Sequence, residues 1–149
     1  MKRIAIFVEG QSELIFIRNL LLVIIDNLKL SFECLKLHGE KQEPAPYKYS
    51  PPTAAVYFLI INVGGDTKVG SAIKEKGKKL FDSGYDEIIG LRDMYCEAYQ
   101  KRSPDNIDDK LSQSLIEGVN KIIQTLVNAE KITIYFSIME IESWILSNV

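Results

Sequence analysis

The chain has 149 residues and a mass of 16.9 kDa, which predicts one domain with a substantial hydrophobic core. Its net charge of −2 excludes a protein that binds nucleic acid through a basic surface alone, although bound metal ions could supply local positive charge. The cysteines, Cys34 and Cys96, lie far apart, and with one histidine, His38, they exclude a cysteine–histidine zinc site and a catalytic triad. We interpret both cysteines as free thiols in a reducing compartment.

The amino-terminal stretch does not predict a membrane segment. Its basic start resembles that of a signal peptide, but no small-residue cleavage site follows, and Glu9 and Glu13 interrupt the apolar run. The run over residues 14–25 contains Arg18 and is too short to span a bilayer. We therefore expect a cytoplasmic protein.

The first predicted strand, residues 3–8, ends in an acid and a glycine. Glu9 and Gly10 follow an apolar, β-branched run directly. A strand inside a compact domain has no structural reason to end in glutamate. The glycine lets the backbone turn sharply and leaves amide groups free at the start of the next helix. Glu9 is thus expected where open α/β sheets place their ligand sites, at the carboxyl end of a strand.

A predicted helix over residues 12–28 follows, with Ser12 as its cap. The helix is apolar almost all round, so we expect it to be heavily buried, with an exposed face that forms a homodimer as the alternative. Residues 31–37 alternate like a strand with one wet face. Residues 39–53 hold four of the five prolines, and we expect a Pro-rich loop insertion there, either a mobile flap or a surface excursion without a role.

The second half of the chain repeats the pattern of strand and helix. A strand over 55–63 precedes a glycine turn and a helix over 69–82, whose lysines indicate either a solvated face or contacts with nucleic-acid phosphates. A strand over 86–92, a helix over 107–128 and a strand over 131–138 complete the set.

This alternation predicts an α/β fold with a mostly parallel central sheet of about four core strands and helices on both faces. We expect one domain over residues 1–149. The chain stops soon after Trp144, part-way into a predicted helix, so a longer parent protein or a truncated one is an alternative to a complete domain.

Acidic residues follow three of the predicted strands. They are Glu9, Asp93 and the pair Glu140 and Glu142. In a parallel sheet these strand ends share one edge, and clustered carboxylates repel one another unless they are protonated or bridged by cations. The pattern therefore favours a Mg²⁺ or Mn²⁺ site. The alternative is that acids are simply common where strands reach solvent.

These motifs resemble a known family. Val8-Glu9-Gly10-Gln11-Ser12-Glu13, Arg92-Asp93-Met94-Tyr95 and Glu140-Ile141-Glu142-Ser143-Trp144 look like the TOPRIM domain of topoisomerases, DnaG-type primases and OLD-family nucleases. The likeness is strongest to small stand-alone OLD-like TOPRIM proteins, and the motifs stand in the same order over essentially the whole chain. The resemblance implies a three-layer TOPRIM/Rossmann-like fold.

The resemblance also implies roles for the acidic residues. Glu9 matches a metal ligand that is also a candidate general acid or base, and Asp93 matches the first aspartate of the family's Asp-x-Asp. Tyr95 stands where the second aspartate is usual, which departs from the pattern. The acids that would complete a second metal position are Glu140 and Glu142.

The function implied is a Mg²⁺- or Mn²⁺-dependent nuclease in which Glu9 and Asp93 are catalytic. It would act on DNA rather than RNA, with an ATPase partner and a role in phage defense. Contacts to the phosphate or substrate are expected from Gly10, Gln11, Ser12 and Lys68. The alternatives are a degenerate, non-catalytic TOPRIM module that binds a protein partner or nucleic acid, and a binder of small phosphate compounds.

Overall fold

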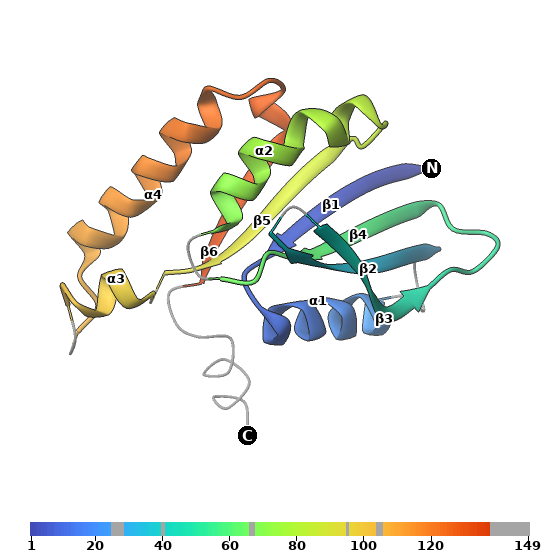
Figure 1. Ribbon diagram of the computed structural model, residues 1–149, viewed down its shortest axis with the longest axis horizontal. Helices are drawn as coiled ribbons and strands as arrows, with labels where there is room; N and C mark the ends of the chain where they lie inside the picture. Colours follow the sequence, from blue (N-terminus) through green and yellow to red (C-terminus); the bar gives the residue numbers. More distant parts are fainter. Residues whose placement is uncertain (25–28, 40, 66–67, 95, 104–105, 138–149) are drawn as a thin grey trace.

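A six-stranded sheet lies between two layers of helices, with α1 on one face and α2 and α4 on the other (Figure 1). This arrangement, seen in a computed structural model, confirms the predicted three-layer α/β fold. The residues that the structure describes are 1–24, 29–39, 41–65, 68–94, 96–103 and 106–137.

Strands and helices follow the predicted order closely. The strands are β1 (Lys2–Val8), β2 (Leu30–His38), β3 (Lys41–Tyr49), β4 (Val56–Asn62), β5 (Glu87–Asp93) and β6 (Ile132–Ser137). The α-helices are α1 (Gln11–Ile24), α2 (Lys68–Asp82), α3 (Glu97–Gln100) and α4 (Asp109–Gln124), and a 3₁₀ turn spans Ala129–Lys131. Within the described ranges, no helix combines the length and the apolar character needed to cross a membrane.

The strand order is β3-β2-β4-β1-β5-β6, and every neighbouring pair is parallel except β2 with β3. The central strand β1 is buried from Ile4 to Val8, as expected for a parallel strand that has helices over both faces. Because the strands run the same way, their carboxyl ends meet along one side of the sheet, which we call the carboxyl edge.

The strand β3 occupies the stretch predicted as a Pro-rich loop over 39–53, so that prediction was wrong and the sheet has six strands rather than about four. Proline is excluded from central strands because it lacks an amide proton, but it is tolerated at an edge. Pro44 and Pro46 are two residues apart, so both missing amides fall on the same side of β3. The outer side of an edge strand makes no hydrogen bonds to another strand, so missing amides on that side remove none.

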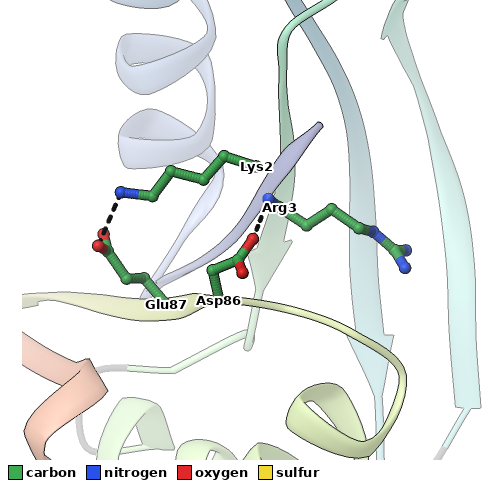
Figure 2. Close-up of polar contacts among 4 residues, drawn as sticks. All are labelled: Lys2, Arg3, Asp86 and Glu87. Atoms are coloured by element: carbon green, nitrogen blue, oxygen red, sulfur yellow. Dashed lines mark hydrogen bonds and ion pairs between the residues drawn. The ribbon is translucent and has the colours of Figure 1, made fainter.

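The opposite, amino edge is tied by polar contacts between β1 and the start of β5. Figure 2 shows Lys2 Nζ 2.7 Å from Glu87 Oε1, and the backbone amide of Arg3 donating to Asp86 Oδ2 at 2.7 Å. The Asp86 amide donates in turn to the Arg3 carbonyl at 2.8 Å. These bonds fix the register of two central strands at the edge remote from the predicted site.

Two apolar cores lie on the two faces of the sheet. Ala5, Phe7 and Ile88 pack beneath α2 and α4, and Ile4, Ile6 and Val8 pack against α1. The contact between β5 and α2 is unusually close at Gly90, because a Cβ there would lie 3.0 Å from Val69 Cγ1. Glycine at this position lets the helix approach the sheet.

The helix α1 is less buried than its composition predicted. Among its residues only Leu14 and Leu21 are buried. Leu20 is 43% exposed and Val23 is 76% exposed. The expectation of a heavily buried helix was therefore wrong, since an apolar composition does not ensure that a second layer covers the outer face.

Both cysteines are buried free thiols, as expected. Burial raises the pKa of the Cys34 thiol to about 11, while the nearby Arg18 lowers it to a smaller extent. The thiol of Cys34 thus stays protonated in the folded protein at pH values where an exposed thiol has ionised.

This burial predicts alkaline destabilisation. Between the ordinary thiol pKa of 9.0 and about 11, the unfolded chain loses the Cys34 proton and the folded chain keeps it. The free energy of unfolding should therefore fall as pH rises above 9, by at most about 1.4 kcal/mol per pH unit from this group. Urea unfolding at about pH 8, 9 and 10 measures the slope. Cys34→Ala should flatten it, and an equal slope in that variant would contradict the assignment.

Candidate functional site

Three of the five buried polar side chains among the described residues lie at the carboxyl edge. Glu9 is 5% exposed, Asn62 is 2% exposed and Ser137 is 2% exposed, and they lie at the ends of β1, β4 and β6. The remainder of each strand is mainly apolar where it faces a core. Burying polar groups is unfavourable unless they find partners, so their concentration at one edge marks it as a candidate site.

The backbone of Glu9 is held from the neighbouring strand. Val8 pairs with Asn62 of β4, and the Val8 carbonyl accepts a bond from Val63 N at 2.9 Å. The Glu9 carbonyl then accepts from Gly65 N at 2.9 Å. The turn between β4 and α2 therefore fixes Glu9 at the mouth of the central strand.

The side chain of Glu9 faces a cation. Arg92 Nε lies 3.7 Å from Glu9 Oε1, and the two side chains are only 14% and 6% exposed. At this distance the contact is a Coulombic pair rather than a hydrogen bond. Sequence reasoning missed Arg92 as a site residue, although its place directly before Asp93 in an otherwise apolar strand was a usable signal.

Asp93 lies at the same edge on the adjacent strand. It is the last residue of β5 and pairs with Ser137 of β6, whose carbonyl accepts from Met94 N at 2.7 Å. Successive residues of a strand alternate between faces. Leu91 belongs to the core beside α1, so the side chain of Asp93, two residues later, leaves the strand on the face of the sheet that α1 covers. The side chain of Arg92 leaves the strand on the face that α2 covers. The predicted catalytic pair therefore occupies neighbouring strands and opposite faces, so a shared ion would have to lie beyond the strand ends.

The predicted phosphate contacts lie around the start of α1. Gln11 and Ser12 are exposed in its first turn, so Ser12 lies within the helix rather than before it as a cap. The Gly10 carbonyl accepts from Leu14 N at 3.3 Å, and Gly10 does not have a positive φ. A Cβ on Gly10 would lie 2.9 Å from Glu13 Oε2, so a carboxylate shares this helix end.

Lys68 approaches the edge from the β4–α2 turn. It is exposed at the first position of α2, and its Nζ donates to the Gly64 carbonyl at 3.3 Å. Gly64 has φ +70°, and its amide donates to Asn62 Oδ1 at 2.8 Å. Asn62 thus shapes the turn that carries Lys68 and that also bonds to Glu9.

A divalent metal would find oxygen ligands here. Glu9 and Asp93 offer carboxylate oxygens, the donor type that Mg²⁺ and Mn²⁺ prefer, although the Arg92 cation already neighbours Glu9. Considering the described residues alone, no three histidine, cysteine, aspartate or glutamate side chains form a metal-holding group. Glu140, Glu142 and Tyr95, on which the predicted second metal position depends, lie outside the described residues.

Comparison of the chain with protein-family models, with curated protein sequences and with solved structures finds no match. The fold and the edge define a class, an α/β protein with a parallel sheet and a polar carboxyl edge. The likeness to the TOPRIM family rests on the sequence motifs and stays a prediction.

Proposed function

We propose that the protein is a TOPRIM-type nuclease that uses Mg²⁺ or Mn²⁺ to hydrolyse phosphodiester bonds, in DNA rather than RNA. The main support is the position of Glu9 and Asp93 at the ends of adjacent central strands, on an edge rich in buried polar groups. Carboxylates in this setting are typical of sites that hold a divalent cation against a phosphate.

Each residue would have a distinct role. Glu9 and Asp93 would hold the metal ion, together with Glu140 and Glu142. When bound, such an ion withdraws charge from the phosphate and activates water. Glu9, with its backbone held by Gly65, could also take a proton from the attacking water. The Arg92 cation, 3.7 Å from Glu9, would help to hold that carboxylate in place.

Nicking of supercoiled plasmid in Mn²⁺ tests this proposal. Glu9→Gln and Asp93→Asn should each lower the rate by about 100-fold or more, the scale seen when a transition-state charge loses its support. Glu87→Gln is the matched control, because Glu87 is a carboxylate at the amino edge of the same strand as Asp93 (Figure 2). Nicking that persists unchanged in the Glu9 and Asp93 variants would identify a contaminant and overturn the proposal.

The biological setting belongs to the same proposal. An ATPase partner and a role in phage defense are what the TOPRIM likeness adds, and the amino-terminal sequence adds the expectation of a cytoplasmic location. Co-purification of an ATPase with the tagged protein would test the partner directly.

A second candidate function is a non-catalytic module that assembles with itself. The observation that favours it is the outer face of α1, where Leu20, Val23 and Ile24 are exposed apolar side chains on one helix. Exposed apolar groups that cluster in this way commonly mark protein contacts. A second copy of the chain could cover this face by packing its own α1 against it.

Self-association through α1 predicts a dimer that a charge can break. Val23→Lys should raise the dimer dissociation constant by about 100-fold. The substitution removes a side chain that the dimer would bury, worth roughly 1.5–3 kcal/mol, and places a charge in the interface. Sedimentation over a range of concentrations measures the change. Ile122→Lys, at an exposed isoleucine of α4, is the matched control and should have no effect. A wild-type protein that stays monomeric at all concentrations would contradict this candidate.

A further inference from the structure

A groove runs along α2 on the side where the helix leaves the sheet uncovered. One cavity of 610 Å³ is lined by Leu59 and Ile61 of β4 and by Lys76 and Lys79 of α2, and a second of 340 Å³ continues past Lys68. The two cavities share Glu75 and Lys76, so they form one groove, which we call the α2 groove.

The floor of the α2 groove is apolar. It consists of side chains from β2, β4 and α2 that belong to the core beneath this helix. They are Leu37, Leu59, Ile61, Val63, Ala72 and Leu80. Most of this floor is shared with the core, with Ile61 1% exposed and Leu59 7% exposed, so the apolar area that faces the groove is small.

The rim of the groove is basic although the whole chain is slightly acidic. Among the described residues that line it, Lys68, Lys76, Lys79 and Arg3 are basic and Glu75 is acidic. Lys76 was predicted to point outward with the other lysines, but its side chain is only 14% exposed. Lys76 lines both cavities, and its ammonium lies 3.2 Å from Glu75 Oε1, so it brings a largely buried positive charge to the middle of the groove.

An aromatic and guanidinium platform closes one end. The Arg3 guanidinium lies 4.3 Å from the centre of the Tyr85 ring, and both residues line the larger cavity. Arg3 Nη1 also donates to the Ser83 carbonyl at 2.7 Å, which holds the guanidinium in place. Bases stack on aromatic rings and on guanidinium planes of this kind.

The other end opens towards the carboxyl edge. Lys68 stands there, on the turn whose Gly65 amide bonds to the Glu9 carbonyl. The helix α2 has 15 residues, so the groove extends for about 22 Å at ~1.5 Å per residue. That length suits a strand of about four nucleotides, the lower limit of known single-strand site sizes.

We infer that the α2 groove binds single-stranded nucleic acid, with bases on the apolar floor and phosphates at the basic rim. A double helix keeps its bases paired and stacked inside, so it could not use this floor. The bound strand would extend towards Glu9. Its delivery to Glu9 for cleavage rests on the proposed nuclease function, whereas binding of the strand in the groove does not.

The test measures binding without chemistry. Fluorescence anisotropy of a labelled oligothymidylate of about 12 nucleotides is followed in EDTA, so that loss of cleavage and loss of binding are separate results. The Lys68→Gln/Lys79→Gln variant should bind at least about 10-fold more weakly. The slope of the logarithm of the binding constant against the logarithm of the salt concentration should fall in magnitude by about 0.7 per lysine. Lys74→Gln/Lys78→Gln, on α2 but outside the groove, is the matched control and should bind like wild type.

Several results would overturn the inference. The inference fails if the wild-type protein does not bind, or if the two double variants bind equally weakly. It also fails if a duplex of the same sequence binds more tightly than the single strand. Displacement of the oligonucleotide by polyglutamate or a mononucleotide as effectively as by unlabelled strand would overturn it too. Binding that follows the expected pattern in a protein without nicking activity would support the groove and reject only the nuclease.

Discussion

Replacing Arg92 with methionine is expected to lower the free energy of unfolding by about 1–3 kcal/mol, because a buried carboxylate loses a neighbouring cation. The substitution keeps most of the side-chain volume but removes the cation that lies 3.7 Å from Glu9 Oε1. Glu9 is 5% exposed, so its charge is poorly screened by water when this cation is lost. Urea unfolding at neutral pH measures the change.

A double variant separates this electrostatic effect from simple loss of packing. Adding Glu9→Gln to Arg92→Met removes the charge of Glu9 as well and should recover part of the lost stability. Lys2→Met is the matched control, because the Lys2–Glu87 pair is exposed and worth at most about 1 kcal/mol. If Arg92→Met lowers the free energy of unfolding no more than Lys2→Met does, the Glu9–Arg92 pair contributes no more to stability than an exposed ion pair.

Gly90→Val is expected to destabilise the protein by about 3 kcal/mol, at the upper end of typical overpacking effects. A Cβ at Gly90 would lie 3.0 Å from Val69 Cγ1 and 3.1 Å from both Ile134 Cγ1 and Ile73 Cδ1. All three neighbours belong to the packed layer between β5 and α2 or α4, so none can move without disturbing the core. Thermal and urea unfolding together measure the effect.

Gly118→Ala provides the contrast on α4. A Cβ there meets nothing within 4 Å, so the same loss of glycine should stabilise the helix by roughly 0.5–1 kcal/mol. In a Gly90→Val/Val69→Ala double variant, the smaller neighbour should relieve part of the clash. Equal effects at the two glycines would show that backbone freedom, rather than the close approach of α2, determines the loss at Gly90.

The order of the elements could be predicted because each buried strand is apolar and is followed by a helical pattern. The strand β3 could not, because prolines normally exclude strands and only the position at an edge makes them acceptable. The exposure of α1 could not be predicted from the sequence either. Periodicity counts apolar residues on a helix, whereas their burial depends on what the rest of the molecule places over them.

The candidate site was predictable at the level of strand ends. Glu9 and Asp93 do lie at the carboxyl edge on adjacent strands. The role of Arg92 and the opposite faces of the two acids depend on the register between β1 and β5, which a single sequence does not contain. The α2 groove depends on where a helix leaves a sheet uncovered, which is likewise a property of the assembled layers.

The path of the chain has a consequence for where ligands can enter. From β1 the connection through α1 leads towards β2 on one side, and from β5 the connection through α4 leads towards β6 on the other (Figure 1). Neighbouring strands whose connections diverge form a topological switch point, and the diverging loops leave a crevice between them. Here the switch point falls between β1 and β5, the strands whose carboxyl ends carry Glu9 and Asp93. The switch point is a product of connectivity rather than of either carboxylate, so a variant without both acids should keep this arrangement of strands and loops.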